Sequence, residues 1–241
     1  MKTACFIPIK EHSERVSGKN FRVLCGKKLY EWVLEHVIEA NCFDDVYVDT
    51  NSDEIKEYAA SRRIFVIDRL ESLALDTANG NDLLMYHRKI KPDYDYYFQL
   101  FATAPFLQPE SITLCANALT SSSEYDSCFT ALKNNSFYWF NAQPVNYRPG
   151  ILPRSQDMTP VVEETTGMYG ITAESLDRYR CRIGKNPYAH FVSKFEAVDI
   201  NTEDDLKIAD FIGQAYLHGG GYESRVVFRF AESALLGEAA A

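Results

Sequence analysis

The sequence predicts an α/β protein built on a mostly parallel, twisted β-sheet with helices on both faces. Two observations support this fold class. Apolar segments of strand length alternate with amphipathic segments of helical period in the first half of the chain, in units of about 30 residues. With 241 residues, 46% of them hydrophobic, the chain can bury a large core, which excludes a mainly disordered protein.

The first strands and helices follow from these periods. Apolar residues at i, i+3, i+4, i+7 and i+8 predict the first helix, and Ser52 is expected to cap the second ahead of two acidic residues. We expect strands at 3–9, 46–50 and 64–67, with helices at 30–38 and from 53 onward. Successive strands separated by helices are typical of a parallel sheet with right-handed connections.

The rest of the chain continues the pattern with one interruption. We expect helices at 81–89, from Pro109 and at 206–217, and strands at 96–101, 127–132, 166–171 and 191–197, the last leading to Asp199. Between them, residues 137–160 are rich in Asn, Pro, Tyr and Arg and predict a β-rich insertion with strands at 137–140 and 145–147. We therefore predict a single domain over 1–218, with an insertion at about 137–165, and a tail at 219–241 without an assigned role.

Charge is distributed unevenly along the chain. The formal net charge is −9, which argues against binding to duplex nucleic acid, because such binding depends on neutralising phosphates. Residues 10–28, however, carry six basic against two acidic side chains, a net charge of +4. This reversal indicates a small, concentrated anion site on an acidic protein.

The cysteines, histidines and apolar runs argue against a metal motif and against a membrane span. The six cysteines lack C-x-x-C spacing and read as reduced thiols, and the five histidines form no H-E-x-x-H pattern. No segment reaches the roughly 18 apolar residues of a membrane span, and the apolar run at the N-terminus is short and contains Pro8. These features predict a soluble, cytoplasmic protein without a membrane or nucleic-acid partner.

The loop after the first strand is the strongest candidate site. It spans about 16 residues from Lys10 to Cys25, whereas most connections between a strand and a helix have two to six. In open parallel sheets, ligands bind at the carboxyl ends of strands, where this loop begins. The loop contains neither a Walker A motif nor G-x-G-x-x-G, so we expect it to hold a triphosphate through basic side chains and backbone N–H groups.

Two acidic patterns are candidates for a metal site. If the strand at 191–197 continues, Asp199 and Asn201 lie on one face at its end, where oxygen ligands can hold Mg²⁺ beside a nucleotide. An equally weighted alternative is that Asn201, Thr202 or Asp204 caps the following helix. The pair Asp93-x-Asp95 resembles the metal motif of nucleotide-sugar glycosyltransferases but precedes its strand, where turn residues are expected.

Several motifs in order resemble one known family. The opening I-P-I-K-E-H-S-E, followed by Lys19 and Asn20, is similar to the I-P-A-R-x-x-S-K-x-x-x-x-K-N motif of cytidylyltransferases of the acylneuraminate type. Further matching residues are Val48, Thr50 and Ile55; Arg69, Leu73, Asp76 and Thr77; Thr103 and Pro105; Arg154 and Gln156; Gly167; and Asp199 with Asp205. The resemblance covers about residues 4–212 and extends more distantly to the CMP-KDO synthetases.

The resemblance implies a Rossmann-like nucleotidyltransferase fold whose insertion is used for dimerisation. It implies transfer of CMP from CTP to the anomeric hydroxyl of an acidic keto sugar such as a sialic acid, with Mg²⁺ or Mn²⁺ as cofactor and pyrophosphate as product, as in the synthesis of surface polysaccharides. The expected catalytic residues are Lys10, Arg15 and Lys19, and the expected nucleotide-binding residues are Pro8, Ser13, Asn20, Arg69, Asn79, Gly80 and Thr103. Metal binding is expected at Asp199 and Asn201, and sugar binding at Arg154, Gln156, Glu164 and Thr166.

Four positions depart from the family pattern. Lys10 replaces an arginine and keeps the charge without the bidentate fork, and Phe101 replaces the glutamine two residues before T-x-P. Asn201 stands where a second metal aspartate is usual, and Thr166 replaces the asparagine before the late glycine. Phe101 leaves the strictness of cytosine selection open, and Asn201 predicts weaker Mg²⁺ binding. Thr166 predicts a changed sugar pocket, so we expect an acid sugar related to N-acetylneuraminate but not necessarily identical with it.

Three alternatives remain open at this point. The acceptor could be a KDO-type octulosonic acid or another acidic compound. The protein could instead be a glycosyltransferase that uses Asp93 and Asp95, or a catalytically weak nucleotide-binding domain, which Phe101 and Asn201 suggest.

Overall fold

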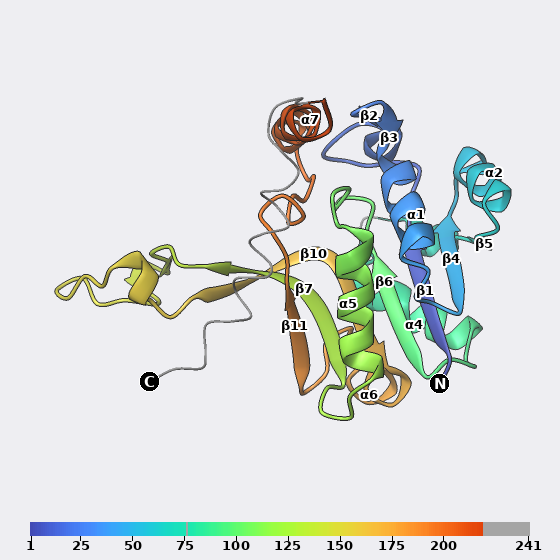
Figure 1. The fold of residues 1–241 in the computed structure, drawn as a ribbon. Coiled ribbons are helices and arrows are strands. Elements are labelled where there is room, and N and C mark those ends of the chain that lie inside the picture. The colour runs from blue at the N-terminus through green and yellow to red at the C-terminus, as the bar shows by residue number, and fades with distance from the viewer. Residues whose placement is uncertain (76, 219–241) are drawn as a thin grey trace.

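A seven-stranded sheet forms the centre of the computed structural model, which describes residues 1–75 and 77–218 (Figure 1). Its strand order is β11-β7-β10-β6-β1-β4-β5. The strands are β1 (Thr3–Pro8), β4 (Asp45–Thr50), β5 (Phe65–Asp68), β6 (Tyr96–Leu100), β7 (Ser127–Asn134), β10 (Val161–Thr172) and β11 (Pro187–Phe191). Only β10 runs antiparallel to its neighbours β6 and β7 in this sheet, so the predicted mostly parallel α/β fold is confirmed.

Helices cover both faces of the sheet. The main helices are α1 (Leu29–Ala40), α2 (Asp53–Ser61), α4 (Gly80–Ile90), α5 (Pro109–Thr120), α6 (Ala173–Tyr179) and α7 (Glu203–His218), with a short α3 at Glu71–Ala74. Strand β1 shows why: Cys5 and Ile7 pack with α1, α2 and α5, whereas Ala4 and Phe6 pack with α4 and α6. This alternation of buried residues to both faces explains the continuous apolar run in the sequence.

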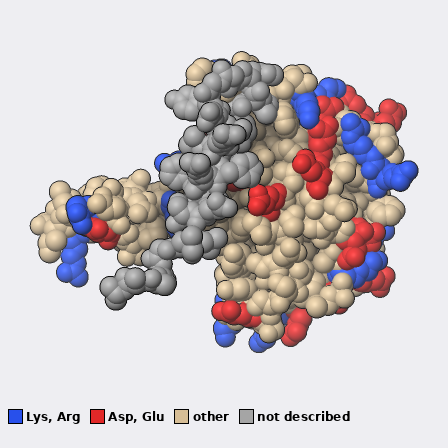
Figure 2. Space-filling model, viewed as in Figure 1, with Lys and Arg blue, Asp and Glu red and all other residues tan. Residues whose placement is uncertain are grey.

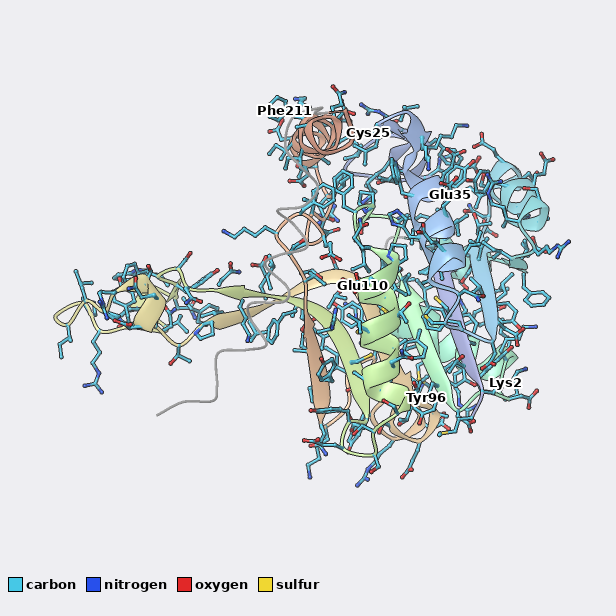
Figure 3. All side chains as sticks on the ribbon, in the orientation of Figure 1. Lys2, Cys25, Glu35, Tyr96, Glu110 and Phe211 are labelled. Atoms are coloured by element: carbon cyan, nitrogen blue, oxygen red, sulfur yellow. The ribbon has the colours of Figure 1, made fainter. Side chains whose placement is uncertain are left out.

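The long loop after β1 folds into short regular pieces. It contains a 3₁₀ helix, η1 (Lys19–Phe21), followed by a small hairpin of β2 (Val23–Leu24) and β3 (Lys27–Lys28). Cys25 and Gly26 form the two-residue hairpin turn, with φ of 50° and 85°. The loop packs against α7: Gly213 leaves room for the Cys25 thiol, and Asp210 accepts a hydrogen bond from the Cys25 backbone N–H at 3.2 Å (Figure 3).

An arm projects from the rounded body between β7 and β10 (Figures 1 and 2). It carries β8 (Trp139–Phe140), β9 (Gln143–Pro144) and the 3₁₀ helix η2 (Ser155–Asp157). The predicted second strand at 145–147 is wrong, because β8 pairs with residues 143–144 through a tight turn at Asn141 and Ala142, both with positive φ. Strand β10 also begins earlier than predicted, because residues 161–164 pair with the extension of β7.

The final strand was predicted at the wrong place: it covers Pro187–Phe191 and shares only Phe191 with the predicted 191–197. Strand β11 ends at Phe191, and Ser193 and Glu196 then form a turn in which each side chain bonds the other's backbone. Phe195 consequently leaves the sheet and stacks on Phe106 at 4.5 Å, in the cluster beneath α7. Residues 193–197 therefore form no strand, and Asp199 lies in the connection to α7.

One cap prediction is wrong and the other is confirmed at Thr202. Ser52 occupies the N-cap position of α2, but its side chain makes no capping bond. At α7, Thr202 accepts from the Asp205 backbone N–H at 3.1 Å, and Asp205 accepts from the backbone of Asn201 and Thr202. Thr202 and Asp205 therefore cap this helix, and the side chains of Asn201 and Asp204 do not. Asp76 and the predicted tail at 219–241 lie outside the described residues.

Candidate functional site

A cavity of about 350 Å³ opens at the carboxyl ends of β1 and β6. Its polar side is formed by residues of the loop after β1 together with Arg69 and Thr103. Its lining residues are Pro8, Lys10, Ser13, Glu14, Arg15, Lys19, Asn20, Arg69, Leu73, Leu75, Ala78, Leu83, Phe101, Ala102 and Thr103. The cavity thus has a cationic half and an apolar half, and the cationic half is the loop that the sequence predicted.

Backbone geometry turns the loop toward the cavity. Gly18 adopts φ 58°, which starts η1 and buries Lys19 and Asn20. Asn20 donates its side-chain amide to the Lys10 carbonyl at 2.8 Å, which closes the loop on itself. The Lys19 ammonium donates to the Ile200 carbonyl at 3.0 Å and so joins the loop to the segment before α7.

The electrostatics of the loop favour an anionic ligand. Burial lowers the pKa of Lys19 below the ordinary lysine value, and the charges of Arg15 and Lys10 lower it further, while Asp199 opposes them. A bound polyanion would relieve this crowding of positive charge. The three basic side chains that the loop contributes to this small cavity therefore match the charge of a single nucleoside triphosphate.

Asp199 lies beside this loop in a hydrogen-bonded cluster. Its Oδ2 accepts from the Thr166 hydroxyl at 2.8 Å and from the Asn201 side-chain amide at 2.6 Å. Its Oδ1 is buried and has no hydrogen-bond partner. The Asn201 Oδ1 accepts from the Arg15 guanidinium at 2.7 Å. The structure brings the two predicted metal residues together through a turn, and not through the strand period expected from the sequence.

This cluster suits a metal with few protein ligands. The described residues include no group of three or more His, Cys, Asp or Glu side chains placed to hold a metal ion. The orphaned Oδ1 of Asp199 is an available carboxylate ligand, whereas the Asn201 oxygen is already bonded to Arg15. One carboxylate fits Mg²⁺, which usually keeps water and substrate phosphates in most of its coordination positions.

Arg69 is held by two residues that the sequence analysis missed. Its Nε donates to Asp49 Oδ1 at 2.9 Å and its Nη2 to the Asp49 carbonyl at 3.0 Å. His87 Nε2 lies 2.6 Å from the other Asp49 oxygen, and Phe6 stacks on the imidazole at 4.5 Å. The side chains of Asp49 and His87 are completely buried. The only sequence feature that could have pointed to this network is Asp49 itself, an acidic residue near the end of an apolar strand.

Charge and burial act together on this network. Burial alone would raise the pKa of Asp49, but the hydrogen bond with His87 and the charge of Arg69 hold it below its ordinary value. Burial lowers the pKa of His87, which is therefore neutral near pH 7. Since His87 Nδ1 has no partner, the proton belongs on Nε2, where it is donated to Asp49.

The remaining predicted residues are distributed unevenly. Asn79 caps α4, accepting from two backbone N–H groups, and Gly80 is the first residue of that helix; neither lines the cavity, although the preceding Ala78 does. Glu164 accepts from the Tyr169 hydroxyl at 2.7 Å. Arg154 and Gln156 lie on the arm, where Arg154 pairs with Asp157 at 2.6 Å, and they do not line the cavity of their own chain.

Asp95 lies at the wrong end of the sheet for the glycosyltransferase alternative. It accepts from the Lys2 backbone N–H at 2.6 Å, at the amino end of β6. Figure 3 shows Lys2 and Tyr96 at the end of the molecule opposite α7. The pair Asp93-x-Asp95 is therefore structural, and it is separated from the cavity by the length of the strand.

Comparisons with known proteins show which family the chain resembles. Residues 4–202 match the family model described as cytidylyltransferase. The chain is 25% identical over 206 residues to N-acylneuraminate cytidylyltransferase A of Danio rerio, covering 82% of this chain and 47% of that protein. It is 25% identical over 232 residues to pseudaminic acid cytidylyltransferase of Campylobacter jejuni, covering 88% of this chain and 96% of that protein.

Solved structures show the same fold. A CMP:2-keto-3-deoxy-manno-octonic acid synthetase complexed with CTP has a TM-score of 0.64 at 16% identity, covering 89% of this chain and 99% of that one. A 4-diphosphocytidyl-2C-methyl-D-erythritol synthase from Anaerococcus prevotii has a TM-score of 0.61 at 13% identity, covering 88% and 96%.

Two further findings concern the length of the chain and its helices. The chain spans about half the length of the first curated relatives, 47% and 49%. No helix among the described residues has the length and apolarity needed to cross a lipid bilayer. The family model, the relatives and the cationic loop agree with the resemblance found in the sequence motifs, and the chain belongs to the cytidylyltransferase family.

Proposed function

We propose that this chain transfers CMP from CTP to the anomeric hydroxyl of an acidic keto sugar and releases pyrophosphate. The observation that carries the proposal is the loop after β1, which arranges Lys10, Arg15 and Lys19 around a cavity of about 350 Å³. Relatives named for N-acylneuraminate and pseudaminic acid support an acidic nine-carbon acceptor. The structural neighbour named for an octulosonic acid makes a KDO-type acid the second candidate acceptor.

In this proposal the chain acts mainly by binding and orienting charge. Lys19 neutralises the α-phosphate and the departing pyrophosphate, and Lys10 and Arg15 hold the outer phosphates, together with Ser13 and Asn20. Arg69, fixed by Asp49, lies at the other wall of the cavity and contacts the nucleoside. The in-line attack by the sugar hydroxyl then needs positioning more than a strong base.

The metal in this proposal is Mg²⁺, or Mn²⁺ in its place. Asp199 would hold it through its unpartnered Oδ1 next to the phosphates, with Asn201 orienting the carboxylate through its amide. When bound, the ion would supply further charge neutralisation on the phosphates. Thr166 also orients Asp199 and so contributes to the metal site and not only to sugar binding.

In this proposal the arm forms the contact between the two copies of a homodimer. It exposes large apolar side chains that a monomer leaves in water, namely Phe137, Trp139, Phe140, Val145, Ile151 and Leu152. Because Arg154 and Gln156 lie on the arm and away from their own cavity, we assign them to the sugar site of a second copy. The dimer would then carry two shared sites.

A pyrophosphate-release assay tests the function. CTP, UTP, ATP and GTP are each combined with N-acetylneuraminate, pseudaminate or KDO, with and without Mg²⁺. We expect release that requires CTP, one acid and the metal. Lys19→Ala should lower the rate about 100- to 1,000-fold, because it removes a preorganised charge from the reacting phosphate. Lys27→Ala is the matched control, since Lys27 pairs with Glu35 outside the cavity.

Two outcomes would overturn the proposal. One is the absence of release across the whole panel. The other is tight CTP binding by calorimetry that is independent of Mg²⁺ and is not followed by turnover. The second result would identify a nucleotide-binding domain without catalysis, in keeping with the commitment of the Asn201 oxygen to Arg15.

A further inference from the structure

The guanidinium of Arg182 occupies an unusual position beside the apolar half of the cavity. Its Cζ lies 3.6 Å from the centre of the Tyr169 ring and 5.5 Å from that of Phe101, which lines the cavity. The loop that carries it follows α6 and is tied to α4, because the Arg182 backbone N–H donates to the Asn81 side chain at 2.9 Å. Two aromatic rings and a fixed backbone therefore hold this cation in place.

Arg182 has no acidic partner among the described residues. None of their carboxylate oxygens forms an ion pair with its guanidinium, and its side chain donates no hydrogen bond to them. The neighbouring carboxylates are engaged elsewhere: Glu164 accepts from the Tyr169 hydroxyl, and Asp82 accepts from the Asn79 backbone. A guanidinium with five donors is thus left without an acceptor in a half-buried position.

The surroundings of Arg182 make an unpaired cation costly. Its Nη1 packs against Gly80, the first residue of α4, so closely that a Cβ at Gly80 would lie 2.6 Å away. The amino end of a helix carries partial positive charge, so a bare cation there is repelled. An anion that contacts the guanidinium beside the first turn of α4 would be attracted by both.

A second polar group beside Gly80 also lacks a partner. Gln99 is fully buried, and its amide donates to the Gly80 carbonyl at 2.9 Å, but its Oε1 accepts no hydrogen bond. This oxygen would lie 3.6 Å from a Cβ at Gly80, on the side where Arg182 packs. Because an amide oxygen only accepts, its partner would be a water or a hydroxyl of the acceptor beside the carboxylate, and not the carboxylate itself.

We propose that Arg182 binds the carboxylate of the acidic acceptor and thereby determines that this chain uses an acid. The inference rests on the proposed function. The triphosphate and the acid repel each other, and a single cationic loop cannot hold both without bringing their charges together. Arg182 lies beyond Phe101, on the apolar side of the cavity, and so provides a separate anchor for the second anion. Its planar fork suits a bidentate carboxylate.

The test compares the acid with its uncharged carboxamide. For Arg182→Ala we expect the KM for the acid to rise about 10- to 100-fold, as for loss of a charge-assisted hydrogen bond, while the KM for CTP changes less than about twofold. The wild-type preference for the acid over the carboxamide should disappear in the variant. Arg182→Lys should recover part of the preference, because it keeps the charge without the fork.

Two further variants sharpen the comparison. Gly80→Ala should push the guanidinium away and raise the KM for the acid with the charge still present. Arg178→Ala is the matched control, because Arg178 also lies over a tyrosine ring, 5.5 Å from the centre of Tyr179, but this ring does not line the cavity, whereas Phe101 beside Arg182 does. It should leave both KM values unchanged.

A structural role for Arg182, in which it only braces Tyr169 or Gln99, predicts a different pattern. The melting temperature would fall, and turnover of acid and carboxamide would fall equally, which would overturn the proposal. A rise in the KM for CTP alone would overturn it as well. If the wild-type protein binds the acid by calorimetry without turnover, the proposed function fails, and loss of that binding in Arg182→Ala still supports the carboxylate anchor.

Discussion

At the residue scale, the arrangement around Arg69 shows how a buried carboxylate can position a cation for a ligand. Asp49 takes two hydrogen bonds from Arg69, through its side chain and its carbonyl, and a third contact from the neutral His87. The Arg69 side chain is only 3% exposed, so its direction is set by the protein and not by solvent. Asp49 therefore positions Arg69, which lines the cavity.

Replacing Asp49 should separate positioning from stability. We expect Asp49→Asn to raise the KM for CTP about tenfold, because Arg69 loses its charged partner. The free energy of unfolding should fall by about 3–5 kcal/mol, as when one member of a buried ion pair is removed. Steady-state kinetics and urea unfolding measure the two effects.

Asp53→Asn is the matched control for this variant. Its carboxylate is 91% exposed and pairs with Lys56, so the free energy of unfolding should change by less than about 0.5 kcal/mol. An unchanged KM for CTP in Asp49→Asn would show that Arg69 does not depend on Asp49 for its orientation.

Sequence reasoning identified Arg69 but not the two residues that hold it. Arg69 belonged to a motif, whereas Asp49 and His87 come from two different elements, β4 and α4, and meet only in the fold. The same limit applies to Arg182, whose partners Tyr169 and Phe101 lie on separate strands or loops. Contacts between distant elements leave no periodic signal in one sequence.

At the scale of elements, the spacing of apolar residues predicted where most strands of the sheet lie. Where a strand ends depends on hydrogen bonds in the turn that follows it. The strands around β1, β4 and β6 were predicted to within about two residues, because they are buried on both faces. Strand β11 was predicted several residues too late, because the alternating apolar residues at 191–197 belong to a turn that sends Phe195 beneath α7, and the strand itself is Pro187–Phe191. The loop after β1 was recognised by its length and charge, although its internal hairpin was not.

We predict that the arm holds a dimer together through its exposed apolar side chains. Trp139 and Ile151 are 58% and 71% exposed, and we expect the double variant Trp139→Ser, Ile151→Ser to convert a dimer into a monomer. Light scattering with size-exclusion chromatography measures the molecular mass. Activity should fall with the dimer, because Arg154 and Gln156 would no longer reach a second cavity.

Phe65→Ser provides the control for the arm, since Phe65 is 53% exposed on the edge strand β5. It should leave the mass unchanged. A wild-type protein that is already monomeric at micromolar concentration and active would remove the assigned role of the arm.

At the scale of the whole molecule, three histidines make stability depend on pH in one direction. Burial lowers the pKa of His36, His87 and His190 below the ordinary value. The folded state therefore binds fewer protons than the unfolded state as pH falls below about 6.5, so acid favours unfolding. The stability contributed by neutral histidines is present above that pH and is lost below it.

We accordingly expect the free energy of unfolding to fall between pH 7.5 and 5.5. Each histidine contributes up to about 1.4 kcal/mol for each pKa unit by which its value is lowered. Urea unfolding at several pH values measures the slope. His87→Phe should reduce the slope, since a phenyl ring can stack on Phe6 without titrating. A wild-type stability that is flat over this range would contradict the assignment of neutral buried histidines.

The contact between the loop after β1 and the segment around α7 sets an order of events during protein synthesis. Lys19 is bonded to Ile200, Arg22 to Glu203 and Cys25 to Asp210, partners that lie 181 to 185 residues later in the chain. At roughly 5–20 residues per second, the ribosome needs about 10–40 s to produce these partners after the loop itself. The loop after β1 therefore lacks these contacts for most of translation, and under the proposed function we expect it to bind nucleotide only after α7 has emerged.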